Sequence, residues 1–202
     1  MLFIYGDSHG NDCFKNLKIP YIDLHSSNKT MYRVGRDGYI INYNRNHHTM
    51  DSIIILVYGE IDCRCHIQKQ INLGQGKDFI INSLVAKYFE SIAANVDKYK
   101  HIIVVAVIPP TSQIDYESIN GPIKHEYPFV GTDENRVMYT KEVNKLLELF
   151  CKKYNYIFFN PYEYYTRQDG CLKYELSDKT VHLKDTSYFH EQFYKLLSDL
   201  GT

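Results

Sequence analysis

The sequence predicts an α/β protein with one parallel β-sheet that is covered by helices on both faces. Short apolar runs alternate along the chain with longer stretches of helical periodicity, as expected when crossover helices connect parallel strands. The runs that begin at Ile53 and Ile102 contain no polar residue, which is typical of central strands buried on both faces. The length of 202 residues, with 44% hydrophobic and 23% charged residues, fits one globular domain spanning residues 1–202.

Five strands and three long helices are expected. The candidate strands are residues 2–5, 21–24, 53–58, 102–108 and 156–159. Helices are expected over residues 79–99, 133–153 and 188–200, where apolar side chains recur every three or four residues. Pro109 and Pro110 end the fourth strand, and the Pro-, Gly- and polar-rich stretch from there to Gly131 is expected to be a long loop. Long loops at the carboxyl ends of parallel strands commonly build the functional site.

The charge balance and the cysteine pattern exclude several classes of protein. The chain has 23 Lys and Arg against 24 Asp and Glu, so it offers no electrostatic surface for nucleic acid or an anionic membrane. No window approaches the ~18 apolar residues of a membrane span, and the apolar N-terminus is too short for a signal peptide. The five scattered cysteines indicate no disulfide framework. We therefore expect a cytoplasmic protein with no nucleic-acid partner and no membrane span.

A candidate nucleophile follows the first predicted strand, in the string Gly6-Asp7-Ser8-His9-Gly10. A hydroxyl just past the carboxyl end of a buried strand, between glycines that permit a tight turn, is well placed to attack a substrate. Asp and Ser before a helix are also typical of an N-cap, so both interpretations stay open.

A serine nucleophile needs a base within hydrogen-bond distance and a carboxylate that orients this base. His182 is the candidate base, because it lies between the last strand and the closing helix and therefore at the same edge of the sheet. The alternative for His182 is a solvated loop histidine.

A polar cluster follows the third predicted strand and contains Gly59, Glu60, Asp62 and Arg64. Gly59 would allow backbone N–H groups to approach an oxyanion, and Arg64 can orient a carboxylate or an anionic substrate group. Alternatively, Glu60 or Asp62 caps the next helix and pairs with Arg64. Both roles are compatible, because a site needs support from surrounding groups.

Metal binding is the weaker interpretation of the neighbouring residues. Possible ligands are Cys63, Cys65, His66, His47 and His48, but C-x-C-H without a second spaced pair is a poor zinc signature. The first turn also lacks a dinucleotide or Walker motif. We expect no metal and no cofactor, and we expect Cys63 and Cys65 to be packing residues. Three tyrosines near the last strand are expected in the core or on the surface rather than in a sugar site: Tyr162, Tyr164 and Tyr165.

The three polar segments together, in this order, resemble the SGNH hydrolase superfamily, also called GDSL-type esterases and lipases. Gly6 to His9 match its first block, Gly59 to Asp62 stand where its third block has Gly-x-Asn-Asp, and Asp178 to His182 stand at its final Asp-x-x-His. The resemblance implies a flavodoxin-like three-layer α/β/α sandwich with a mainly parallel five-stranded sheet. It also implies a serine nucleophile, a histidine base and an ester substrate.

Two departures from the family pattern affect the site. Ile61 stands where the family has an asparagine that donates to the oxyanion, which leaves Arg64, or less favourably His66, as the replacement. Lys179 stands at the expected aspartate, so either Asp178 reaches His182 through a local loop or Ser8 and His182 act as a dyad. The resemblance also implies a second-block glycine in the oxyanion hole, and both Gly35 and Gly38 fit that position.

The sequence therefore predicts a serine esterase that hydrolyses an acetyl or other short acyl ester, with a small molecule or a glycan as substrate. An acyltransferase in glycan modification is the neighbouring alternative, since a sugar hydroxyl could resolve the same acyl-enzyme. A non-catalytic binding module that keeps the fold is the alternative from another class.

Overall fold

The computed structural model describes residues 1–27, 29–38, 49–96, 99, 101–124 and 126–201. In this part of the chain, five strands form one sheet in the order β2-β1-β3-β4-β5, and all neighbouring strands are parallel. The strands are β1 (Leu2–Gly6), β2 (Tyr21–Asp23), β3 (Ile53–Val57), β4 (His101–Val105) and β5 (Ile157–Phe159). The parallel sheet expected from the sequence is confirmed, and each strand overlaps its predicted run.

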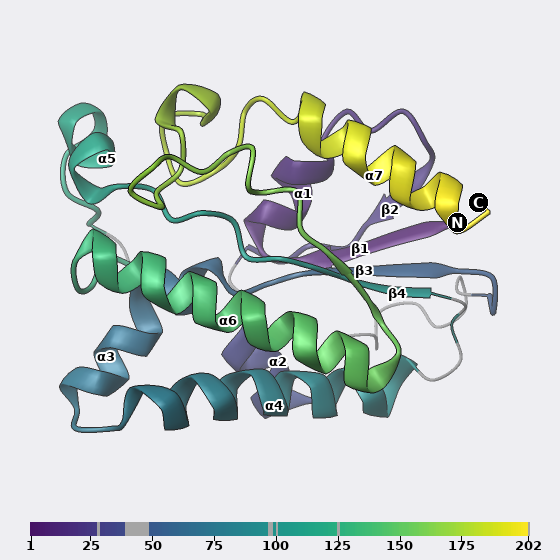
Figure 1. Ribbon diagram of the computed structural model, residues 1–202, viewed down its shortest axis with the longest axis horizontal. Helices are drawn as coiled ribbons and strands as arrows, with labels where there is room; N and C mark the ends of the chain where they lie inside the picture. Colours follow the sequence, from purple (N-terminus) through teal and green to yellow (C-terminus); the bar gives the residue numbers. More distant parts are fainter. Residues whose placement is uncertain (28, 39–48, 97–98, 100, 125, 202) are drawn as a thin grey trace.

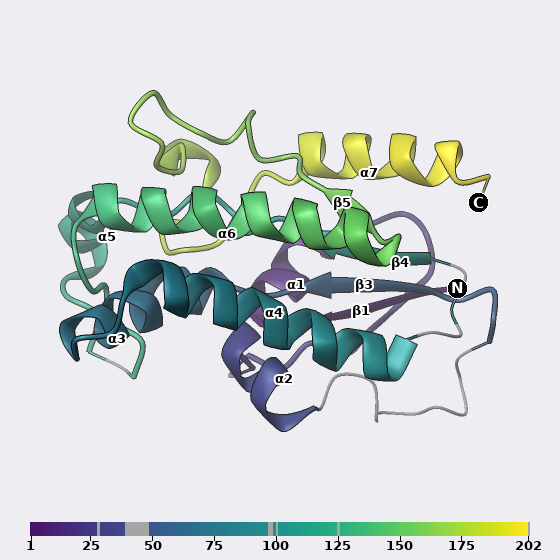
Figure 2. The same ribbon diagram turned by 60° about the horizontal axis from the view of Figure 1, so that its bottom comes forward.

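Helices cover both faces of the sheet (Figures 1 and 2). One face carries α1 (Ser8–Phe14) and α7 (Ser187–Asp199), and the other carries α2 (Met31–Asp37), α4 (Lys77–Val96) and α6 (Asp133–Tyr154). The three layers confirm the predicted α/β/α sandwich. The three long helices lie within three residues of their predicted ends, because each carries a continuous apolar stripe toward the sheet.

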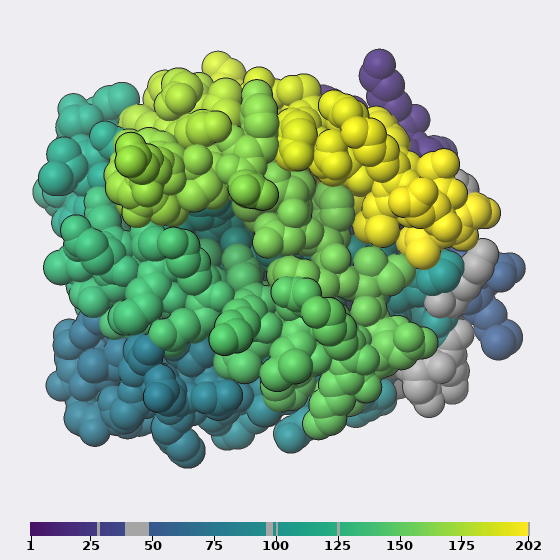
Figure 3. All heavy atoms as spheres, in the orientation of Figure 1, coloured from purple at the N-terminus to yellow at the C-terminus, as the bar shows by residue number. Residues whose placement is uncertain are grey.

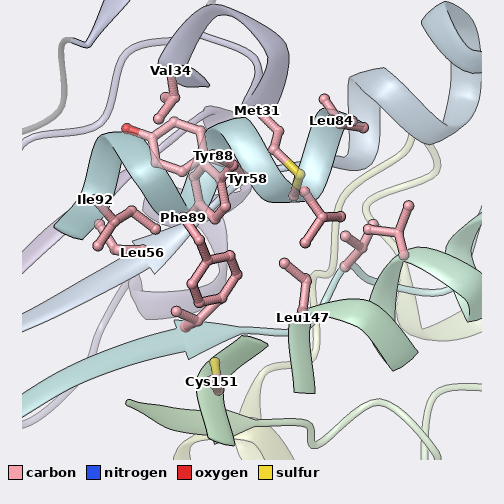
Figure 4. Packing of buried hydrophobic residues seen from close by; sticks show 14 of the residues in the cluster. Met31, Val34, Leu56, Tyr58, Leu84, Tyr88, Phe89, Ile92, Leu147 and Cys151 are labelled. Carbon is pink, nitrogen blue, oxygen red and sulfur yellow. The ribbon is translucent and has the colours of Figure 1, made fainter. Parts of the chain in front are cut away.

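The alternation of side chains along β1 and β3 divides the core into two clusters. Phe3 and Leu56 point into the cluster under α2, α4 and α6, whereas Ile4 and Ile55 point into the cluster under α1 and α7. Figure 4 shows residues of the first cluster, including Tyr88 and others from α2, α4 and α6, packed against the sheet. β1 and β3 are buried along their whole length, which explains their uninterrupted apolar sequence.

The prediction of one long loop between Pro110 and Gly131 was wrong in part. This segment contains α5 (Gln113–Asn120), which ends at Gly121 with φ 69°. The helix has no buried residue, so it lacks the apolar periodicity on which a prediction depends. Three further short elements belong to the irregular regions: the π-helical turn η2 (Asp62–His66), α3 (Ile67–Asn72) and the 3₁₀ turn η3 (Tyr174–Leu176).

Candidate active site

The turn that carries Ser8 is built by close backbone packing at the end of β1. Gly6 pairs with Val57 of β3, and a Cβ on Gly6 would lie 2.7 Å from the Val57 carbonyl oxygen. Asp7 is the N-cap of α1, since its carboxylate accepts from the backbone N–H of His9 at 2.9 Å. Asp7 therefore caps the helix, and Ser8, its first residue, lies at the carboxyl edge of the sheet, where the sequence placed it.

Ser8 and His182 are hydrogen-bonded, with 2.8 Å between Ser8 Oγ and His182 Nε2. The side chain of His182 is 21% exposed, so the pair is open to solvent on one side. The two residues line a cleft of about 450 Å³, whose other walls include Ser27, Ile61, Tyr127 and Thr180. This is the separation at which a histidine can remove the proton of a serine hydroxyl.

Asp178 returns to His182 although four residues separate them in the last block. The Asp178 N–H donates to the His182 carbonyl oxygen at 3.0 Å, and Lys179 adopts a left-handed conformation with φ 71°, which folds the loop back on itself. Asp178 Oδ2 lies 3.6 Å from His182 Nδ1, which is too long for a hydrogen bond but within ion-pair range. The loop therefore brings the carboxylate to the imidazole without the spacing expected from the family.

Thr180 lies between the two. Its hydroxyl donates to Asp178 Oδ1 at 2.6 Å and lies 3.0 Å from His182 Nδ1. Partial burial on its own would raise the pKa of the Asp178 carboxyl, but the interactions with His182 and Thr180 outweigh burial and hold this pKa below its usual range. Asp178 is therefore a carboxylate at neutral pH.

A second histidine lies directly behind the first. His9 is 2% exposed, and its ring centroid is 4.6 Å from that of His182. Its Nδ1 lies 3.1 Å from Asp7 Oδ1, and its Nε2 lies 3.1 Å from the Val181 carbonyl oxygen. Both partners are acceptors, so both ring nitrogens must donate, and His9 is an imidazolium.

The charge of His9 is held by these partners against the cost of burial. Burial alone would lower the pKa of His9, but the Asp7 carboxylate, with smaller contributions from Glu60 and the Val181 carbonyl, raises this pKa to about 9. His9 thereby links the turn that carries Ser8 to the loop that carries His182. This role of His9 was not predicted from the sequence, where the only signal is its place next to Ser8.

Arg64 lines the cleft, but each of its three guanidinium nitrogens already donates to another group of the protein. Its Nε donates to Glu60 Oε1 at 2.7 Å and its Nη2 to Glu60 Oε2 at 3.1 Å, while Nη1 donates to the Tyr127 carbonyl oxygen. Burial would raise the pKa of Glu60, yet the charge of Arg64 lowers it overall. The predicted pairing of Glu60 with Arg64 is thus present. The bond from Arg64 to the Tyr127 carbonyl also holds the loop between α5 and α6 against η2.

One interpretation of the sequence expected Asp62 to cap the following helix, but it does not. Its Oδ2 instead accepts from the backbone N–H of Met31 at 2.8 Å, at the start of α2, and its Oδ1 lies 3.2 Å from His66 Nδ1. The buried carboxylate therefore joins the loop after β3 to α2. His66 does not line the cleft around Ser8.

The three glycines proposed for the oxyanion site have structural roles. Gly35 lies inside α2, where a Cβ would be 3.0 Å from the Lys87 backbone of α4, and Gly38 is the left-handed C-cap of α2. Gly59 has φ 121° and packs against Val107 and Met31. None of them lines the cleft. The prediction that Gly35 or Gly38 lies beside Ser8 was wrong. The chain after β2 forms the helix α2, which places Gly35 against α4 and Gly38 at its own C-terminus, and neither lines the cleft.

Ser27 is the residue after β2 that does line the cleft. Its position follows from Ser26, whose backbone N–H donates to the Gly6 carbonyl oxygen at 2.8 Å and so holds this loop against the end of β1. Ile61 also lines the cleft, and its side chain offers no donor.

The remaining sequence predictions concern metal ligands and tyrosines. Among the described residues, no group of three or more His, Cys, Asp or Glu side chains is arranged to hold a metal ion. Cys63 and Cys65 are buried as packing residues, whereas His47 and His48 lie outside the described residues. Two of the tyrosines near β5 are core residues, Tyr162 and Tyr165, and Tyr164 stacks on Tyr188 at 4.4 Å.

A second hollow lies on the face that Figure 3 shows, between α6 and the segment after β5. It measures about 370 Å³, and Lys141, Asn144 and Thr166 are among its lining residues. It shares no lining residue with the cleft around Ser8. The Asn144 amide is already used by the backbone of Val107, so its role there is structural. In the described part of the chain, no helix is both long enough and apolar enough to cross a bilayer.

Solved structures of esterases and lipases share this architecture, a parallel sheet between two layers of helices. Solved structures bear out this fold. A catalytic mutant of an acetylxylan esterase from Geobacillus stearothermophilus superposes with a TM-score of 0.59 at 11% identity, covering 96% of this chain and 92% of its own. A GDSL-like lipase from Bacteroides thetaiotaomicron gives 0.56 at 14% identity, covering 100% and 88%. A carbohydrate acetylesterase from Sinorhizobium meliloti gives 0.52 at 14% identity, covering 98% of each.

Sequence comparison adds no closer relationship. No protein-family model matches the chain, and no curated protein matches it. The fold expected from the resemblance to SGNH hydrolases is thus confirmed by structure.

Proposed function

We propose that this protein is a serine esterase of the SGNH type that removes an acetyl or other short acyl group from a carbohydrate or another small polar ester. The observation that carries the proposal is the hydrogen bond of 2.8 Å between Ser8 Oγ and His182 Nε2 in an open cleft. Similar folds occur in an acetylxylan esterase and a carbohydrate acetylesterase, which supports this substrate class.

The reaction follows from the positions of these groups. Ser8 Oγ attacks the acyl carbonyl carbon while His182 Nε2 takes the hydroxyl proton, and the C–O bond to the alcohol then breaks as Nε2 returns the proton to the leaving oxygen. Water then attacks the acyl carbon while Nε2 takes one of its protons. The bond from the acyl carbon to Ser8 Oγ breaks as Nε2 returns the proton to Oγ, and the acid is released. Asp178 stabilises the transient imidazolium from 3.6 Å, and Asp12 Oδ2 does so from 3.7 Å on the other side of the ring.

The oxyanion would be held by backbone donors rather than by a side-chain amide. The Ser8 N–H belongs to the first turn of α1, where no carbonyl lies one turn earlier to accept it. Ser27 is the proposed second donor, because its loop is tied to the end of β1 and lines the same cleft. A missing donor typically costs about 100- to 1,000-fold in rate, so replacing the family's asparagine matters.

Covalent labelling tests the proposal directly. The protein is incubated with a fluorophosphonate probe and analysed by intact mass and peptide mapping, with Ser8→Ala and the exposed-helix control Ser118→Ala alongside. We expect one adduct on Ser8 in the wild type and in Ser118→Ala, and none in Ser8→Ala. Absence of both labelling and turnover of p-nitrophenyl acetate would favour the binding-module alternative. Transfer of the acyl group to an added oligosaccharide in preference to water would identify an acyltransferase.

A further inference from the structure

The loop that carries His182 places a hydroxyl where the family has a direct carboxylate–histidine contact. Thr180 Oγ1 lies 2.6 Å from Asp178 Oδ1 and 3.0 Å from His182 Nδ1, whereas the carboxylate itself stays 3.6 Å from that nitrogen. The Thr180 hydroxyl therefore lies closer to Asp178 and to His182 than these two side chains lie to each other.

The hydrogen bonds at these contacts determine which nitrogen of the His182 imidazole carries the proton. The Asp178 carboxyl is ionised at neutral pH and can only accept, so the single hydroxyl proton of Thr180 must point to it across 2.6 Å. The Thr180 oxygen is then an acceptor toward His182, and Nδ1 must carry the proton of that bond. Because a neutral imidazole has one N–H, Nε2 is left unprotonated and faces Ser8 Oγ as an acceptor.

We propose that Thr180 is a positioning residue that connects Asp178 to His182 and selects the tautomer in which Nε2 can act as the base. This inference rests on the proposed function for its catalytic meaning, although the tautomer itself does not. When Nε2 takes the serine proton, Nδ1–H stays bonded to Thr180, and the polarised hydroxyl transmits part of the Asp178 charge to the imidazolium. No proton leaves Thr180 in the cycle.

Two backbone hydrogen bonds hold Thr180 in this place. Its backbone N–H donates to Asp178 Oδ1 at 2.8 Å, and its carbonyl oxygen accepts from the Thr111 hydroxyl at 3.3 Å. Thr111 follows β4, so the relay is attached to the sheet as well as to its own loop. A hydroxyl that is fixed before substrate arrives needs no reorganisation during the reaction.

Kinetics on matched variants provide the first test. Thr180→Val keeps the shape of the side chain but removes the hydroxyl, and we expect it to lower kcat about 10- to 100-fold with little change in KM, as loss of an orienting partner does. Thr180→Ser should restore activity to within about threefold. Thr166→Val, which removes the hydroxyl hydrogen bond of a residue that does not line the cleft, is the control and should leave kcat unchanged. Full activity in Thr180→Val would overturn the proposal.

Histidine NMR provides a readout that does not depend on turnover. Long-range 1H–15N spectra of protein labelled at its 9 histidines, recorded at mildly alkaline pH, distinguish Nδ1–H from Nε2–H, and His182→Asn assigns the signal. We expect His182 to be the Nδ1–H tautomer in the wild type and a mixture in Thr180→Val. An Nε2–H tautomer in the wild type would refute the relay. An Nδ1–H tautomer in a protein that the fluorophosphonate does not label would support the relay while the esterase proposal fails.

Discussion

Ser8 and His182 form a pair in which each group depends on the other. The hydroxyl is a useful nucleophile only when a base accepts its proton, and the base has no task without the hydroxyl. We expect Ser8→Ala and His182→Ala each to lower kcat for p-nitrophenyl acetate by about 10⁴-fold or more, and the double variant to be hardly worse than either. Steady-state kinetics on the three proteins, with His25→Ala as a surface control, measure this. Losses that multiply would contradict a shared role.

Because His9 is a buried imidazolium, we expect the protein to lose stability as the pH becomes alkaline. Its pKa is raised from 6.5 to about 9 in the folded protein, so its stabilising effect is complete below about pH 6.5 and is lost as the pH rises through about 9. The shift corresponds to about 3 kcal/mol at most.

His9→Gln should therefore be less stable than the wild type at pH 6 by up to about this amount, and the difference should shrink toward pH 10. Urea unfolding across this pH range measures the free energy of unfolding of both proteins. His25→Gln, which alters an exposed pair with Asp23, is the matched control and should give parallel curves. A constant gap between His9→Gln and the wild type would show that His9 is neutral.

At the scale of elements, Arg64 joins η2 to the loop between α5 and α6. Two further contacts hold this loop. The Val130 N–H donates to the Arg64 carbonyl oxygen, and the guanidinium groups of Arg64 and Arg136 lie over the Phe129 ring, 5.9 Å and 4.9 Å from its centroid. This loop forms one wall of the cleft. A lysine has no fork with which to hold both oxygens of Glu60.

Arg64→Lys should therefore destabilise the protein much as Arg64→Ala does. Each is expected to lower the free energy of unfolding by about 3–5 kcal/mol, because Glu60 is left buried without its partner. Replacing both residues, as in Glu60→Leu with Arg64→Met, should recover most of this loss. Chemical denaturation of the four proteins decides the point. Wild-type activity and stability in Arg64→Lys would show that a point charge is sufficient.

The contact between α2 and α4 gives Gly35 a role in packing. Gly35→Ala should lower the free energy of unfolding by about 1–3 kcal/mol, because the methyl group meets the α4 backbone at 3.0 Å. Turnover per folded molecule should be unchanged, since Gly35 does not line the cleft. Gly38→Asn is the control: its site is open, and asparagine tolerates the left-handed conformation at φ 62°. A large fall in kcat for Gly35→Ala with normal stability would restore it to the oxyanion hole.

For the whole molecule, the parts of the fold that could be predicted are those with a continuous sequence signal. The apolar run at Ile53 and the stripe along α6 are visible in the sequence because burial there is continuous. The placement of Ser8 and His182 at one edge follows from the rule that loops after parallel strands meet there. By contrast, α5 buries nothing and left no pattern.

The site details that could not be predicted depend on tertiary contacts. Whether Gly35 faces substrate or a helix is decided by the backbone of α4, and the role of Arg64 is decided by the Tyr127 carbonyl, 63 residues away. The return of Asp178 to His182 depends on the left-handed conformation of Lys179, which lysine rarely adopts. Local spacing carries none of this information.

The distance along the chain between Ser8 and His182 has a kinetic consequence. The two residues are 174 positions apart, so their hydrogen bond closes a loop that includes nearly the whole chain, and such contacts form late because their entropic cost comes before their gain. During refolding from urea, we expect the far-UV circular dichroism of the helices to recover before hydrolysis of p-nitrophenyl acetate does. Recovery of both signals in one phase would show that the two loops dock together with the helices. If the two signals recover separately, ester turnover reports when the two ends of the chain dock, whereas the circular dichroism signal reports when helices form along the whole chain.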